Sequence, residues 1–158
     1  GAAHDDVAAA AHAAPTLAVP ESYARAAAEE GLDAACLPRQ LCGEFDEGFP
    51  EGPHADLWRR CSVVVGMHPD QATEPIVAAA LRHGKPFGVV PCCVFPTANP
   101  HRRLADGSPV VQHEEFVTYL LQKAPEQLAR SSLPTFEGRN VVVHSAIDAG
   151  AAQCSECV

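Results

Sequence analysis

The sequence has few of the residues that bind nucleic acid or span a membrane. It carries 11 basic against 20 acidic residues, a net charge of −9, which opposes non-specific attraction to nucleic acid or to an anionic membrane surface. Trp58, Tyr23 and Tyr119 are too scattered to indicate a base-stacking surface. Nothing approaches the roughly 18 consecutive apolar residues of a membrane span. These features predict a soluble protein whose contact with RNA must be local.

Methionine is also scarce, and its place bears on how the chain begins. The single methionine is Met67 and the first residue is Gly1, which predicts either a trimmed chain or a mature form that has lost a leader. A length of 158 residues suits one domain with a real core. We expect a loosely held, alanine-rich segment over residues 1–15, a single α/β domain over 16–147 and a polar, cysteine-containing tail over 148–158.

The seven cysteines do not fit a disulfide framework, because their number is odd and several lie in or beside apolar segments. This favours a reducing compartment, the cytoplasm or an organelle matrix or stroma. Cys154 and Cys157 have the two-residue spacing of a metal clip or a redox pair. Their place in a tail favours an incidental role instead, so no metal is expected.

Apolar segments alternate between strand and helix patterns along most of the chain. Strands are predicted at 16–19, 32–41, 62–66, 87–90 and 140–144, and helices at 22–30, 69–82 and 113–123. Ser22 is expected to cap the first helix and Gly31 to end it, while residues 43–55 read as a surface loop. The valine-rich strands are typical of parallel sheets covered on both faces. We therefore expect a three-layer α/β fold with a mostly parallel sheet, like part of a Rossmann fold.

Two predicted strands are followed by residues that suit a binding site. In such sheets the ligand crevice lies at the carboxyl ends of the strands, here the segments after Val65 and Val90. His68 and Asp70 then form an acid–base or recognition pair, and Gly66 allows a ligand to approach closely. In the alternative interpretation, Asp70 or Thr73 caps the helix and His68 forms a hydrogen bond within its own turn.

The other candidate residues near this edge are cysteines and a basic cluster. Cys92 and Cys93 point to opposite faces if the strand stays regular, which predicts one core cysteine and one at the rim. Residues 101–103, His-Arg-Arg, either contact phosphate or form an exposed run of loop charges. A zinc deaminase lacks support, because His68-Pro69-Asp70 is not the His-x-Glu that it needs, and Val94 and Phe95 stand where its second cysteine would lie. A Cys–His hydrolase built on Cys92 or Cys93 with His68 lacks a recognisable third residue.

Residues 63–95 resemble a set of methyltransferase-like domains. In that set a histidine element follows the fourth strand and Pro-Cys-Cys ends the next, and the members include transfer-RNA ribose methyltransferases and the domain that follows a glutathione-transferase C-terminal module. The matching residues are His68, Ala72, Thr73, Pro91, Cys92 and Cys93. The resemblance implies a Rossmann-like sheet that binds S-adenosylmethionine, with the segment after the fourth strand lining the pocket. Taken with the strand-end argument above, it leads us to expect Gly66, Met67, Pro91, Cys92 and Cys93 as cofactor-binding residues and His68 and Asp70 as catalytic residues.

The chain departs from this set in two ways. His68-Pro69-Asp70-Gln71 replaces the usual His-x-Cys-Gly, and the Gly-rich loop and following acidic residue that hold the cofactor are not found. Either the chain is a fragment, or it has lost cofactor binding, or a partner chain completes the site. Two functions therefore stay open: a methyltransferase-like domain that acts on RNA or a protein, and a non-catalytic accessory subunit of a larger assembly, built on a degenerate methyltransferase fold.

Overall fold

The computed structural model describes residues 17–135 and 137–146. It divides the chain into two compact units, one ending at Glu44 and the other beginning at Phe45, so the predicted domain of residues 16–147 contains parts of both. The predicted segments 1–15 and 148–158, with Cys154 and Cys157, lie outside the described residues. Among the helices of the described part, none is long and apolar enough to cross a membrane.

The first unit contains the predicted helix but little strand. Helix α1 (Glu21–Glu29) begins after Pro20 rather than at Ser22, and Gly31 follows it with a φ of +69°, a conformation in which glycine commonly ends helices. The expected strands reduce to one isolated bridge between Ala18 and Gln40. A short 3₁₀ turn, η1 (Ala34–Cys36), occupies the segment predicted as an interrupted strand.

The second unit is a mixed α/β structure. Its elements in chain order are η2 (Phe49–Glu51), α2 (Ala55–Arg60), β1 (Val64–Met67), η3 (Asp70–Ala72), α3 (Thr73–Arg82), β2 (Phe87–Val90), α4 (His113–Gln122), β3 (Leu128–Ser132) and β4 (Val141–Ser145). The predicted strands 62–66, 87–90 and 140–144 and the helices 69–82 and 113–123 are therefore confirmed within a few residues. Strand β3 and helices η2 and α2 were not predicted.

The four strands form one sheet in the order β1-β2-β4-β3. Strands β1 and β2 are parallel and joined by α3, as predicted, but β4 is antiparallel to both of its neighbours. The prediction of a mostly parallel sheet is therefore wrong. Helix α4 carries the chain over to β3, which runs in the direction of β2, and the short return over residues 133–140 brings β4 back between them. A connection of that length makes an antiparallel pair, because a parallel one needs a longer crossover.

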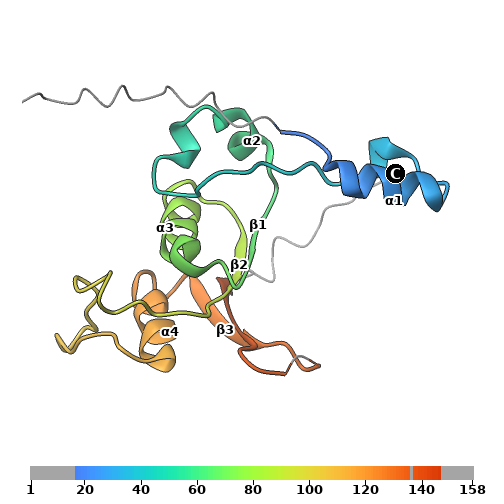
Figure 1. Ribbon diagram of the computed structural model, residues 1–158. Helices are drawn as coiled ribbons and strands as arrows, with labels where there is room; N and C mark the ends of the chain where they lie inside the picture. The colour runs from blue at the N-terminus through green and yellow to red at the C-terminus, as the bar shows by residue number, and fades with distance from the viewer. Residues whose placement is uncertain (1–16, 136, 147–158) are drawn as a thin grey trace, which may run out of the picture. The chain divides into compact units, whose positions relative to one another are not determined.

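Helices α3 and α4 lie on the same side of the sheet (Figure 1). Their apolar faces and the inward residues of the strands form the core, whose largest fully buried side chains include Phe116, Leu120, Val77, Val89, Val117 and Val143. On the other face Val65 is 72% exposed and Met67 53% exposed. The predicted three-layer arrangement is thus not seen in the described residues. The continuous valines of β1 do not indicate burial on both faces here, because alternate side chains point to solvent.

Gly66 allows β1 to pack closely against the turn that follows it, against β2 and against α3. A Cβ atom at Gly66 would lie 3.0 Å from Pro69 Cγ, 3.2 Å from Val89 Cγ1 and 3.3 Å from Ile76 Cδ1. These contacts are tighter than close-packed interiors normally allow. The surroundings of Gly66 are therefore protein side chains, whereas the sequence had suggested close approach of a ligand.

The two glycines of the β1–β2 pair should respond differently to alanine. Gly66→Ala is expected to lower the free energy of unfolding by about 1–3 kcal/mol through overpacking. Gly88→Ala is the matched control, because its Cβ would meet Val142 and His144 only at 3.8 and 3.9 Å and alanine restricts the unfolded chain. Urea denaturation of both variants tests the assignment, and equal losses of stability would contradict it.

Candidate functional site

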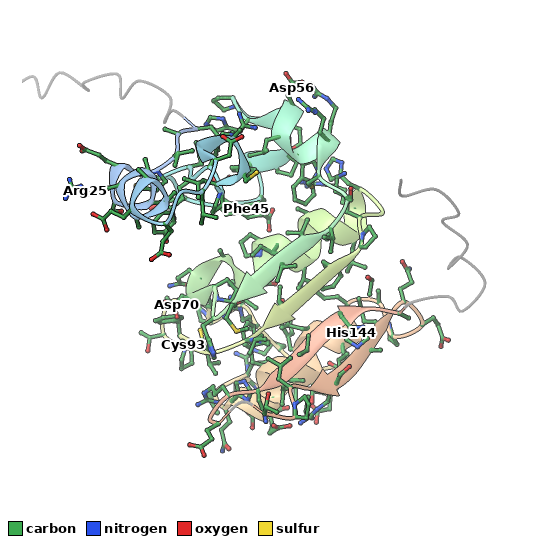
Figure 2. All side chains as sticks on the ribbon, turned by 90° about the vertical axis from the view of Figure 1, so that its right-hand side faces the viewer. Arg25, Phe45, Asp56, Asp70, Cys93 and His144 are labelled. Carbon is green, nitrogen blue, oxygen red and sulfur yellow. The ribbon has the colours of Figure 1, made fainter. Side chains whose placement is uncertain are left out.

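The parallel pairing of β1 and β2 brings two turns to one edge of the sheet. Met67 is the register partner of Val90, and the N–H of His68 donates a hydrogen bond to the Val90 carbonyl at 3.2 Å. The residues after each strand therefore leave the sheet together. Asp70 and Cys93 lie close to each other at this end of the sheet (Figure 2). The predicted meeting of the two segments is confirmed.

Both thiols of the Cys-Cys pair face the carboxylate of Asp70. The Cys92 thiol donates a hydrogen bond to Asp70 Oδ1 at 3.0 Å, and one ligand atom from each of Asp70, Cys92 and Cys93 lies within 4.8 Å of the others. The sequence had predicted that the two cysteines point to opposite faces. That prediction is wrong, because the strand ends at Val90 and the alternation of a strand no longer applies beyond it.

The hydrogen bonds of this cluster set its protonation at neutral pH. Those from Cys92 and then Cys93 lower the pKa of Asp70, with the nearby His68 acting in the same direction. Burial, followed by the hydrogen bond to Asp70, raises the pKa of Cys92 to about 11. Cys92 is therefore a protonated hydrogen-bond donor rather than a thiolate, and only the thiolate is a good nucleophile. The hydrogen bond to Asp70 therefore gives no support to a Cys–His hydrolase that uses Cys92 as its nucleophile.

The remaining predicted site residues surround this cluster at different depths. Met67 is exposed at the end of β1, and Pro91 is fully buried at the end of β2. Nε2 of His113 lies 2.9 Å from the Pro91 carbonyl oxygen, which fixes the start of the Cys-Cys segment. Thr73 does not cap α3, because its hydroxyl donates to the Asp70 carbonyl oxygen at 2.8 Å instead of accepting a bond from the helix backbone.

Three residues other than glycine hold left-handed backbone conformations at this edge. His68 has a φ of 50°, and Asp70 and Phe95 each have a φ of 48°. Asp and His adopt this region more readily than most residues, but a bulky aromatic residue does so rarely. Conformations of this kind cost of order 1–3 kcal/mol each and concentrate at functional sites. Asp70 is thus itself strained, and His68 and Phe95 lie two residues before Asp70 and two residues after Cys93.

A buried ion-pair network holds the segment after the cysteines against α3 and α4. Arg102 is 3% exposed and donates to Glu74 Oε2 and to the Val94 carbonyl oxygen, both at 2.7 Å. Glu74 also accepts a hydrogen bond from the Tyr119 hydroxyl at 2.5 Å and an ion pair from Lys123 at 2.7 Å. Burial alone would raise the pKa of Glu74, but its three partners outweigh burial and lower it to about 2.

This network changes the interpretation of the basic cluster at residues 101–103. Arg102 is not available to a phosphate, because its guanidinium is buried against Glu74 and lies 4.6 Å from the centre of the Phe116 ring. His101 and Arg103 are the exposed members. The other predicted alternative, an exposed run of three loop charges, is also wrong, because the middle residue is buried.

Several residues that support the site were not found from the sequence. Glu74 is the main one, and Asn99, which donates to Gln71 Oε1 at 3.2 Å, links the two turns directly. The only available signal was the four-residue spacing of Tyr119 and Lys123 on a predicted helix, which places them on one face. Nothing in the sequence indicated that Glu74, far from them along the chain, would be their partner.

Comparison with known proteins found no matching family model, no matching curated protein and no matching solved structure.

Neutralising Glu74 should destabilise the second unit and change its response to acid. Glu74→Gln is expected to lower the free energy of unfolding at pH 7 by roughly 3–5 kcal/mol, because Arg102 loses its buried counter-ion. Since the folded-state pKa lies below the ordinary value of 4.5, wild-type stability from this group is complete above about pH 5 and is lost as pH falls toward 2. The free energy of unfolding that the wild type loses in this pH range is about 3 kcal/mol, and the variant should not show this loss.

Urea unfolding at a series of pH values measures both effects. Glu114→Gln is the matched control, because Glu114 also pairs with an arginine, Arg130, but at an exposed site. It should leave the stability at neutral pH nearly unchanged. An acid response of Glu74→Gln that matches the wild-type response would contradict the assigned role of the network.

Proposed function

We propose that the chain is a methyltransferase-like domain that forms one wall of an S-adenosylmethionine site, with RNA as the acceptor class favoured by the resemblance. The observation that carries this proposal is the β1–α3–β2 unit. Its parallel strands end together, and the two turns that leave them carry the matching histidine and Pro-Cys-Cys residues. The carboxyl ends of parallel strands are where such sheets bind ligands.

The chemistry of the rim is compatible with methyl transfer. The ionised Asp70 favours a cationic ligand such as a sulfonium, and its pKa is held low by the cysteine hydrogen bonds. His68 supplies an imidazole, the side chain that most often acts as a general base. S-adenosylmethionine would supply the methyl group from its sulfonium sulfur to the acceptor atom, and His68 would take up the proton that the acceptor gives up.

The sheet also leaves room for the part that the sequence lacks. Strand β1 is at one edge of the sheet, and among the described residues it pairs only with β2. A parallel sheet that continued beyond β1 would place further strand ends beside the His68 turn. Strands β1, β2 and β3 run in one direction and only β4 is reversed, and mixed sheets occur in many α/β folds.

Calorimetric titration of the chain with S-adenosylmethionine tests the proposal. Saturable binding is expected, and His68→Ala should weaken it at least about tenfold, the loss that follows 1.4 kcal/mol of binding energy, with little change in melting temperature. His101→Ala is the matched control, because that histidine lies in a neighbouring loop and is exposed. Absence of heat at millimolar ligand would exclude cofactor binding by this chain.

A second candidate function is that of an accessory subunit, and the open face of the sheet favours it. Val63, Val65 and Met67 are exposed large apolar residues on or beside β1, and the edge of β1 offers unpaired backbone groups. Exposed strand edges and apolar patches of this kind are typical interaction sites. A partner strand added to β1 would complete the sheet without requiring any cofactor.

Self-association of the isolated chain should reveal this surface. Light scattering after size-exclusion chromatography is expected to show a mass that rises with concentration, and Val65→Lys should suppress the rise, since edge lysines block strand pairing. Leu57→Lys is the matched control at an exposed apolar position on α2. A wild-type chain that stays monomeric at all concentrations would count against the subunit role.

A further inference from the structure

Asp70, Cys92 and Cys93 form a compact set of metal-ligating atoms. Two thiols and one carboxylate oxygen lie within 4.8 Å of one another. Ligand atoms held at about 2.0–2.3 Å by one tetrahedral zinc ion lie roughly 3.3–3.8 Å apart. From this geometry we propose that the cluster is a binding site for a thiophilic divalent cation of the zinc class. From the sequence no metal was expected, since a metal clip was weighed only at Cys154 and Cys157.

The donor set selects the kind of ion. Thiolates favour soft or borderline ions, and a site with two of them is a poor match for Mg²⁺ or Ca²⁺, which prefer oxygen ligands throughout. Zinc accepts sulfur and carboxylate ligands together. On binding, the ion replaces the protons of both thiols, which are released to water, and forms one bond to each sulfur and one to the Asp70 carboxylate.

The surroundings hold the three ligands in place from both sides. On one side the Asp70 carbonyl accepts the Thr73 hydroxyl at 2.8 Å. On the other, the cysteine segment is fixed by His113 at the Pro91 carbonyl and by the buried Arg102 at the Val94 carbonyl. Supported ligands of this kind need little reorganisation when the ion arrives.

The site is also open to solvent. Asp70 and Cys93 are exposed and Cys92 is partly buried, so an ion can enter without local unfolding. Three protein ligands leave the fourth tetrahedral position for water or a substrate atom, which is the pattern of catalytic rather than structural zinc. The proposal is independent of S-adenosylmethionine binding, because it concerns the metal alone.

Titration of the reduced full chain with Co²⁺ followed by Zn²⁺ tests the proposal. The expected result is a thiolate-to-cobalt charge-transfer band that saturates at one equivalent and disappears when zinc displaces the cobalt. Cys92→Ser/Cys93→Ser should abolish the band. Losing a group that only orients a metal ligand typically weakens binding roughly 10- to 100-fold. Because Asp70 is proposed as a ligand itself, Asp70→Asn should weaken zinc binding by more than this.

Other cysteines of the chain provide the matched controls. Cys36→Ser/Cys42→Ser removes two exposed thiols of the first unit, and Cys154→Ser/Cys157→Ser removes the Cys-x-x-Cys pair of the tail. Both variants should retain the full band. A band that persists in Cys92→Ser/Cys93→Ser, or that is lost with the tail pair, would overturn the assignment, as would the absence of any band in the wild-type chain.

A measurement on the wild-type chain does not depend on how the variants fold. Alkylation mapped by mass spectrometry should show that zinc protects Cys92 and Cys93 while Cys36 and Cys42 stay reactive. Equal alkylation of Cys93 with and without zinc would overturn the proposal. Because S-adenosylmethionine is absent from both experiments, their failure is distinguishable from failure of the proposed methyltransferase role.

Discussion

The buried pair between Arg102 and Glu74 is the interaction on which the candidate site depends. Arg102 comes from the long segment between β2 and α4, and Glu74 from the first turn of α3. Their bond joins that segment to the helix, while Tyr119 and Lys123 bind the same carboxylate from α4. A buried charge is tolerated only when it is paired and hydrogen-bonded. The segment therefore has one position in which the charge of Arg102 is satisfied.

That position determines where the two cysteines lie. The same guanidinium that binds Glu74 also binds the Val94 carbonyl, directly after Cys93 in the chain. Together with His113 at the Pro91 carbonyl, it shapes the backbone of a segment that is neither strand nor helix. The proximity of both thiols to Asp70 thus depends on contacts made by residues that do not belong to the cluster.

In the second compact unit, the sequence predicted single helices and strands better than the way in which the strands pair. The crossover from β1 through α3 to β2 could be predicted because its apolar periodicity and its stop at His83-Gly84 are local signals. Strand β3 was missed because Ala129 is followed by Arg130, Ser131 and Ser132, and an edge strand exposed along most of its length has no apolar alternation. The direction of β4 could not be predicted, since Val141, Val142 and Val143 fit a central strand of either orientation.

The site shows the same division between local and long-range information. The meeting of His68 and Asp70 with Cys92 follows from parallel pairing and was predictable. The direction of the Cys93 side chain was not predictable, because it depends on the end of β2 at Val90 and on contacts of the distant Arg102. The resemblance to methyltransferase-like domains rests on residues of this predictable part and stays a prediction.

The position of β4 also orders the events by which the sheet is built. It is the last strand among the described residues, yet it lies between β2 and β3, pairing His144 with Gly88 on one side and with Ala129 on the other. The pairing with β2 joins segments far apart in sequence, so we expect it to form after the local pairing with β3, because its loop entropy must be overcome first. Until residues 141–145 are synthesised, β2 and β3 both lack their shared neighbour. A chain that ended before Val141 would lose the middle of its sheet rather than an edge.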